Sequence, residues 1–127
     1  MDSQRIVHKI LRDFDLDGPF RVDLESGLCS IIDVIRLICQ KSKEHARVTL
    51  ARVLQKESEK DPDNPFELRR MKINGIGHET PVGNAALIIE IIWLLPGEAA
   101  QRICRYSAGI IARYLVGDIV LSDDPSE

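Results

Sequence analysis

Aromatic residues, paired cysteines and long apolar runs are all scarce in this chain. Only 5% of its 127 residues are aromatic, so the core is expected to be mainly aliphatic. The three cysteines are an odd number and include no C-x-x-C pair, which excludes a disulfide framework. No apolar run reaches the ~18 residues that a membrane span requires. The sequence therefore predicts neither a secreted disulfide scaffold nor a membrane protein.

From the sequence we expect neither a signal peptide nor a metal site. The residues that follow Met1 are polar and include no apolar segment of the kind that precedes signal cleavage. We therefore expect an intracellular protein with reduced thiols, nuclear in a eukaryote and cytoplasmic in a bacterium or virus. His8, His45 and His78 are too scattered to predict a zinc site. Because no nucleophile–base pair or cofactor loop is found, we predict a non-catalytic protein with no metal and no small-molecule cofactor.

A surplus of positive charge is missing as well, since the formal net charge is −3. Nucleic-acid-binding domains are usually basic, so this value argues mildly against such a role. The acidic excess, however, lies at the two ends of the chain. Residues 41–114 contain twelve lysines and arginines against nine acidic residues, a balance of +3. The middle of the chain therefore permits DNA binding without requiring it.

Hydrophobic periodicity predicts an α+β fold, a mainly helical compact domain with a small two- or three-stranded sheet. Helices are expected over residues 3–14, 31–38, about 43–55, about 85–95 and 98–115, and short strands over 20–24, 68–73 and 78–82. Residues 56–66 contain two prolines and four acids and are expected to form an exposed loop.

Several helix ends can be predicted from local residue types. The expected N-caps are Ser3, Ser30 in a capping box with Asp33, Ser42, and Gly83 or Asn84. Gly117 is expected to follow the last helix. The inner face of that helix is predicted to hold Ala99 or Ala100, Ile103, Ser107, Ile110, Ile111 and Tyr114.

An ordered set of motifs runs through the second half of the chain. Residues 75–82 (GIGHETPV) form a G-x-G-x-x-T-P-V stretch, followed by 88–97 (IIEIIWLLPG), Ala100 and 113–118 (RYLVGD). Together with residues 30–35, Ala46, Arg47 and Leu50, this succession resembles the BRO-N/KilA-N-like domains of large DNA viruses, phages and mobile-element proteins. The resemblance covers about residues 20–121. It implies a compact α+β module that binds DNA without catalysis.

The resemblance also suggests a division of the chain. Residues 1–18 would form an N-terminal helical extension, 19–121 the BRO-N/KilA-N-like domain and 122–127 an acidic flexible tail. Two positions depart from the family pattern. Ile103-Cys104 occupy positions where related domains often have Phe-Arg, and Val116 precedes Gly117-Asp118 where Gly-Gly-Asp is usual. The first departure puts a DNA contact at that turn in doubt.

Three groups of cations are the candidate DNA contacts, and DNA is the expected partner. The candidates are Arg69, Arg70 and Lys72 on a predicted strand and turn; Lys41, Lys43, Arg47 and Arg52 on and before one helix; and Arg102 and Arg105 on the last helix. They would meet phosphates or a groove of the DNA. Acidic residues interleave these groups, so an ordinary solvated charged face is the alternative explanation for any one of them. The turn at Gly75 and Gly77 could also bring backbone N–H groups close to a phosphate.

A protein-interaction or self-association module of the same fold, without nucleic-acid binding, is the alternative function. The net acidity and the absence of arginine at position 104 favour it. So does the apolar run at residues 88–95, which could contact a homodimer or protein partner if it is not fully buried. Under either hypothesis the domain would act in regulation rather than catalysis.

Overall fold

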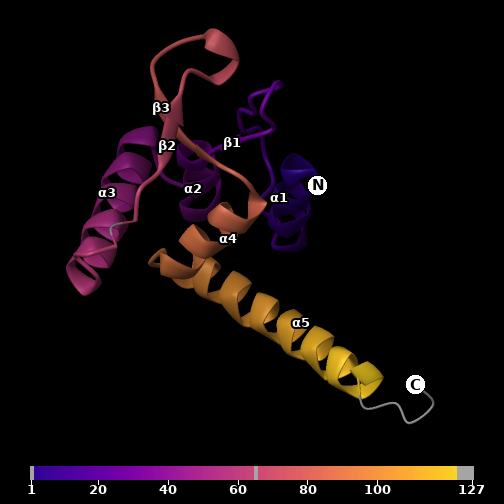
Figure 1. Ribbon diagram of the computed structural model, residues 1–127. Helices are drawn as coiled ribbons and strands as arrows, with labels where there is room; N and C mark the ends of the chain where they lie inside the picture. The colour runs from indigo at the N-terminus through magenta and orange to yellow at the C-terminus, as the bar shows by residue number, and fades with distance from the viewer. Residues whose placement is uncertain (1, 65, 123–127) are drawn as a thin grey trace.

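A computed structural model describes residues 2–64 and 66–122 of the chain (Figure 1). Within those residues lie five α-helices, one 3-10 turn and three short strands. In chain order these are α1 (Ser3–Asp13), β1 (Cys29–Ser30), α2 (Ile31–Cys39), α3 (Lys43–Lys60), β2 (Arg69–Met71), the 3-10 turn η1 (Ile73–Gly75), β3 (Thr80–Gly83), α4 (Ala85–Leu94) and α5 (Glu98–Ser122). The predicted mainly helical α+β fold with a small sheet is confirmed.

The three strands form one antiparallel sheet in the order β1-β3-β2. Arg70 lies opposite Pro81 and Cys29 opposite Gly83. The strand predicted at residues 20–24 is wrong, since Val22 makes only an isolated bridge with Cys29. The reason is the turn that follows at once: the Gly27 amide donates to the Asp23 carbonyl at 2.7 Å, which reverses the chain before a strand can extend.

Helix α2 lies at the centre of the core, and six of its nine residues are buried. Ser30 caps it as predicted, because its hydroxyl accepts a hydrogen bond from the Asp33 amide at 3.3 Å. The second half of the predicted capping box is wrong. The Asp33 carboxylate does not return to the Ser30 amide, which donates instead to the Arg21 carbonyl at 2.9 Å. Asp33 is left free to bind the Arg21 side chain.

Helix α1 contributes to the same core as the rest of the chain. Val7 is 1% exposed and Leu11 is fully buried, and both belong to the hydrophobic cluster that α2 and α4 share. Asp2, and not the predicted Ser3, caps α1. The Ser3 hydroxyl accepts a hydrogen bond from the Ala85 amide at 3.0 Å. This bond ties the predicted N-terminal extension to the start of α4.

Two helices are longer than the sequence suggests. Helix α3 continues past residue 55 to Lys60, so the loop predicted to start at 56 is wrong for its first five residues. Lys and Glu are good helix formers, and Glu57 pairs with Lys60 at 3.3 Å. Pro62 then restricts Asp61 and stops the helix.

Helix α5 passes through Gly117 to Ser122, so the predicted stop at Gly117 is wrong. Gly117 is not among the residues with positive φ, the conformation of a C′ glycine. The next proline in the sequence is Pro125, too late to stop the helix at 117. The predicted acidic tail lies outside the described residues, apart from Ser122.

The apolar run at residues 88–95 is mostly core. Ile88, Ile91, Ile92 and Leu95 are each 6% exposed or less, whereas Trp93 is 47% exposed. The predicted inner face of α5 is only half covered. Ala100 and Ile103 are buried, but residues 110, 111 and 114 are exposed, which corrects that prediction.

The turn between β2 and β3 is held by a hydrogen-bonded clasp around Asn74. Its side-chain oxygen accepts from the Leu24 amide at 2.8 Å, and its side-chain nitrogen donates to the Val22 carbonyl at 3.1 Å. Its backbone amide donates to the Asp23 carboxylate at 2.8 Å. This bond and those from Ser26 hold the pKa of Asp23 below its ordinary value. Asn74 has φ 55°, a left-handed conformation that asparagine tolerates well.

Replacing Asn74 with alanine should therefore destabilise the protein by about 2 kcal/mol, from the unpaired backbone groups and the left-handed strain. Asn74→Gly keeps the conformation but loses the side-chain bonds, so an intermediate loss is expected. Urea unfolding measures both. Asn64→Ala, in the exposed loop after α3, is the control and should change little. If the two Asn74 variants were as stable as the unchanged protein and the Asn64→Ala control, the clasp would have no structural role.

Candidate nucleic-acid interface

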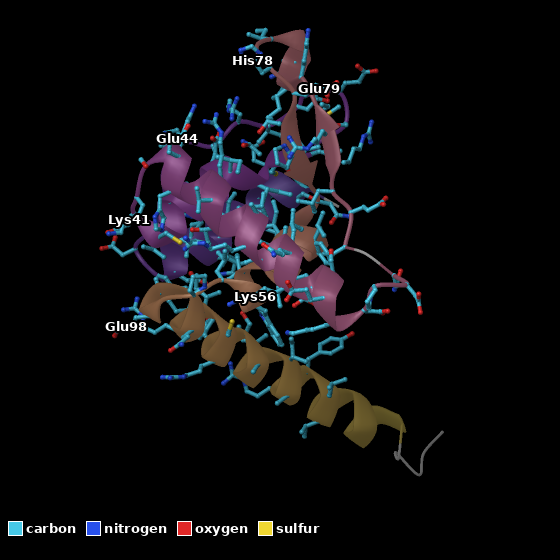
Figure 2. All side chains as sticks on the ribbon, turned by 90° about the vertical axis from the view of Figure 1, so that its left-hand side faces the viewer. Lys41, Glu44, Lys56, His78, Glu79 and Glu98 are labelled. Carbon is cyan, nitrogen blue, oxygen red and sulfur yellow. The ribbon has the colours of Figure 1, made fainter. Side chains whose placement is uncertain are left out.

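A groove of about 410 Å³ lies between α3 and the hairpin formed by β2 and β3. Its lining residues come from four parts of the chain: Arg21, Ile32, Lys43, Arg47, Leu50, Ala51, Leu54, Arg70, Gly77, His78, Glu79, Thr80 and Pro81. Figure 2 shows His78 and Glu79 near the end of the hairpin, with Glu44 on α3 below them. Ile32 and Leu50 of the lining are buried, whereas Lys43, Arg47 and Arg70 are exposed.

Four cationic side chains from three distant segments line this groove. Lys43 and Arg47 are one helical turn apart on α3, Arg70 comes from β2, and Arg21 comes from the segment before β1. Glu79 is the one carboxylate among the lining residues. The groove therefore favours an anionic ligand.

Arg21 is held in place by Asp33. Its Nε donates to Asp33 Oδ2 at 2.9 Å and its Nη2 donates to Oδ1 at 3.2 Å, a bidentate pair. The Asp33 side chain is 5% exposed and that of Arg21 46%, so the pair runs from the core to the groove. The bond with Asp33 raises the pKa of Arg21. Burial disfavours the charged form of Asp33, but the hydrogen bonds from Arg21 outweigh burial and lower its pKa.

Arg47 and Lys43 are less constrained. Arg47 Nη1 pairs with Glu44 Oε1 at 2.7 Å, but the Glu44 side chain is 81% exposed. An exposed pair of this kind contributes only about 0–1 kcal/mol, so a phosphate can replace the carboxylate at little cost. Lys43 is exposed in the first turn of α3, close enough to Asp33 to help lower the pKa of that carboxyl. Both side chains are available to a ligand in the groove.

The predicted strand cluster is divided between the two faces of the sheet. Arg70 lines the groove, whereas Arg69 lies opposite Val82 on the other face, because neighbouring residues of a strand point in opposite directions. The charge of Arg69 acts on Asp23, whose pKa it helps to lower. Lys72 is exposed just before η1. Of these three candidates, only Arg70 lines the groove.

The remaining candidates lie elsewhere. Arg52 is exposed on α3 outside the groove lining. Lys41 lines a separate pocket with Glu98 at the start of α5, and both are labelled in Figure 2. Arg102 lies 5.8 Å from the centre of the Phe14 ring, a cation–π contact, and Arg105 is exposed on α5. The structure thus brings together Lys43, Arg47 and Arg70 and separates them from the other six.

The turn after β2 contributes backbone to the groove. Gly77 lines it with φ +78°, and Gly75 has φ +72°, both in the left-handed region where a side chain is strained. No atom lies near the positions that their side chains would occupy. The need for glycine is therefore conformational, and the Gly77 backbone remains open toward a ligand.

Arg21 and His78 are two of the lining residues that were not predicted as site residues. Arg21 occupies an alternating segment that indicated a strand, and its role depends on Asp33, twelve residues away. The motif Ser30-x-x-Asp33 predicts a helix cap, so it gave no signal that Asp33 binds Arg21. His78 comes to the groove through the hairpin, and its position in the sequence gave no signal either.

The chain matches no family model, no curated protein and no solved structure. None of the helices described here combines the length and apolar character needed to cross a membrane. In the described part of the chain, no three His, Cys, Asp or Glu residues are grouped so that they could hold a metal ion. What the site can do must therefore be argued from its own residues.

Proposed function

We propose that this protein binds DNA, with the groove between α3 and the β2–β3 hairpin as the contact surface for the phosphate backbone. The observation that carries the proposal is the meeting of Arg21, Lys43, Arg47 and Arg70 around one groove. Glu79 is the one carboxylate of its lining, and Asp33 and Glu44, beside the groove, pair with Arg21 and Arg47. Phosphate contacts from lysine and arginine provide most of the affinity of non-specific DNA binding. The motifs at residues 75–97 and 113–118 resemble those of BRO-N/KilA-N-like domains, and this resemblance implies the same function, although no family model matches the chain.

The two kinds of cation in the groove would act differently. Arg21 is oriented by a buried carboxylate, so it presents its guanidinium at low entropic cost to a phosphate oxygen. Lys43 and Arg47 are exposed side chains near the start of α3, where the helix dipole also favours an anion. The Gly77 backbone offers an N–H group at the hairpin end of the same groove. The contacts named are with phosphates, which fix position and affinity rather than sequence.

A titration of labelled DNA at several salt concentrations tests the proposal. The probes are a 20-base-pair duplex and a single strand of the same length, followed by fluorescence anisotropy. Three or four phosphate contacts predict a plot of log K against log salt with a slope of about −3, since each contributes about −0.9 on duplex DNA. No binding at about 50 mM salt up to tens of micromolar protein would overturn the proposal. So would binding that is independent of salt.

A further inference from the structure

Residues 108–117 of α5 are mostly apolar and uncovered. All of them are exposed, and this part of the helix projects beyond the other elements (Figure 1). Six large side chains here are partly or mostly exposed: Tyr106 47%, Ile110 42%, Ile111 46%, Tyr114 75%, Leu115 52% and Val116 60%. Arg113 is the one charged residue between positions 106 and 117. Such a surface is unusual on a monomer.

The exposed residues continue a line that begins in the core. Ala100 and Ile103 are buried against the body of the protein. Steps of four, three and four residues then lead from Ile103 to Ser107, Ile110 and Tyr114. Alternating steps of three and four define the a and d positions of a coiled coil. We call Ser107, Ile110 and Tyr114 the seam, because they extend this line beyond the body.

The projecting helix needs a packing partner. From Arg105 to Ser122 it is about 27 Å long, at 1.5 Å per residue. A single helix of this length is marginal in water, and most helices in proteins are stabilised by packing of their apolar face. In the seam, Ile110 is 42% and Tyr114 75% exposed. Beside the seam, the ring of Tyr106 lies 5.4 Å from that of Phe14.

We propose that the seam pairs with the seam of a second copy of this chain, forming a helix–helix homodimer. The four large side chains on the seam side of the helix, Tyr106, Ile110, Ile111 and Tyr114, offer on the order of 400 Å² per chain, about half of the roughly 800 Å² that one partner contributes to a standard interface. The near absence of charge matches the composition of homodimer cores. An identical seam is complementary to itself under two-fold symmetry. A membrane surface fits less well, since Arg105 and Arg113 provide too little of the cationic face that interfacial helices carry.

Two matched double variants test the dimer by sedimentation of the full chain at 1–200 µM, without DNA. The unchanged chain should sediment as a dimer of twice 14.3 kDa. Ile110→Glu with Tyr114→Glu puts two charges on the seam, four residues apart, and should raise the dimer Kd on the order of 100-fold. Ala108→Glu with Ala112→Glu puts the same charges at the same spacing on the opposite side of the helix, and should leave the Kd within a few-fold.

Two results would overturn the proposal: a monomer throughout the concentration range, or equal loss of dimer in both double variants. All four substituted residues are exposed, so the body of the protein should fold in each case. The seam and the groove share no residue. Sedimentation therefore decides the dimer whether or not the groove binds DNA.

Discussion

Replacing Lys43, Arg47 and Arg70 together with alanine is expected to weaken DNA binding on the order of 100-fold at low salt. Each charge-assisted contact with a phosphate contributes about 1–2 kcal/mol, and three such losses add to more than 3 kcal/mol. The salt slope should also become less steep by two to three, about one for each lost contact. Anisotropy titrations over a range of salt concentrations measure both quantities. All three side chains are exposed, so the fold should survive.

The matched control removes the same amount of charge elsewhere. Lys41, Arg102 and Arg105 are replaced by alanine, which lowers the net charge by the same three units but leaves the groove intact. Binding by this variant should stay within about threefold of the unchanged protein, because surface charges beyond a Debye length are screened. If both triple variants lose affinity equally, the groove is not the contact surface and only overall charge matters.

The parts of the fold that depend on residues close together in the sequence could be predicted from the sequence. Ser30, Ser42 and Asn84 each cap a helix as expected, since a cap needs only its own side chain and an amide three residues later. The failures involve competition between distant groups. Asp33 was expected to complete a capping box, but the Arg21 guanidinium offers two stronger, charge-assisted bonds.

The candidate site was predicted only in part, and for a geometric reason. Charge density along the chain picked out residues 69–72, but the alternation of a strand places Arg69 and Arg70 on opposite faces of the sheet. Helical spacing, by contrast, correctly keeps Lys43 and Arg47 together. Arg21 joins them through the tertiary fold. No local pattern could have placed residues 21, 43 and 70 around one groove.

The length of α5 was underestimated because a glycine was given too much weight. Gly117 signals a helix end only when it can take a left-handed conformation at the last turn. Here α5 runs through Gly117 to Ser122. A helix that extends beyond the body of its own monomer is difficult to predict from periodicity, because the pattern does not say which molecule covers the apolar face.

Replacing Arg21 with alanine is expected to destabilise the protein by about 3 kcal/mol at pH 7, more than replacing Asp33. The asymmetry follows from burial: the Asp33 side chain is 5% exposed and that of Arg21 46%. Losing Arg21 leaves a buried carboxylate without its counter-ion, which is costly. Losing Asp33 leaves a half-exposed guanidinium that water can solvate. The double variant, with alanine at both positions, should therefore be more stable than Arg21→Ala alone.

The Arg21–Asp33 pair also predicts how the free energy of unfolding depends on pH. Loss of packing alone in Arg21→Ala would not produce this dependence. In the unchanged protein the pKa of Asp33 lies below its unfolded value of about 3.9, so its stabilisation is present above that pH and is lost as the pH falls through the folded pKa. In Arg21→Ala, burial without the cation raises the pKa of Asp33 above the unfolded value, so protonation at low pH relieves the cost. The stability gap between the two proteins should narrow from pH 7 to pH 3 in urea unfolding. Arg52→Ala, on the exposed surface of α3, is the control and should be as stable as the unchanged protein at both pH values. If the loss of stability in Arg21→Ala stays constant with pH, the charge of Asp33 has no role in it.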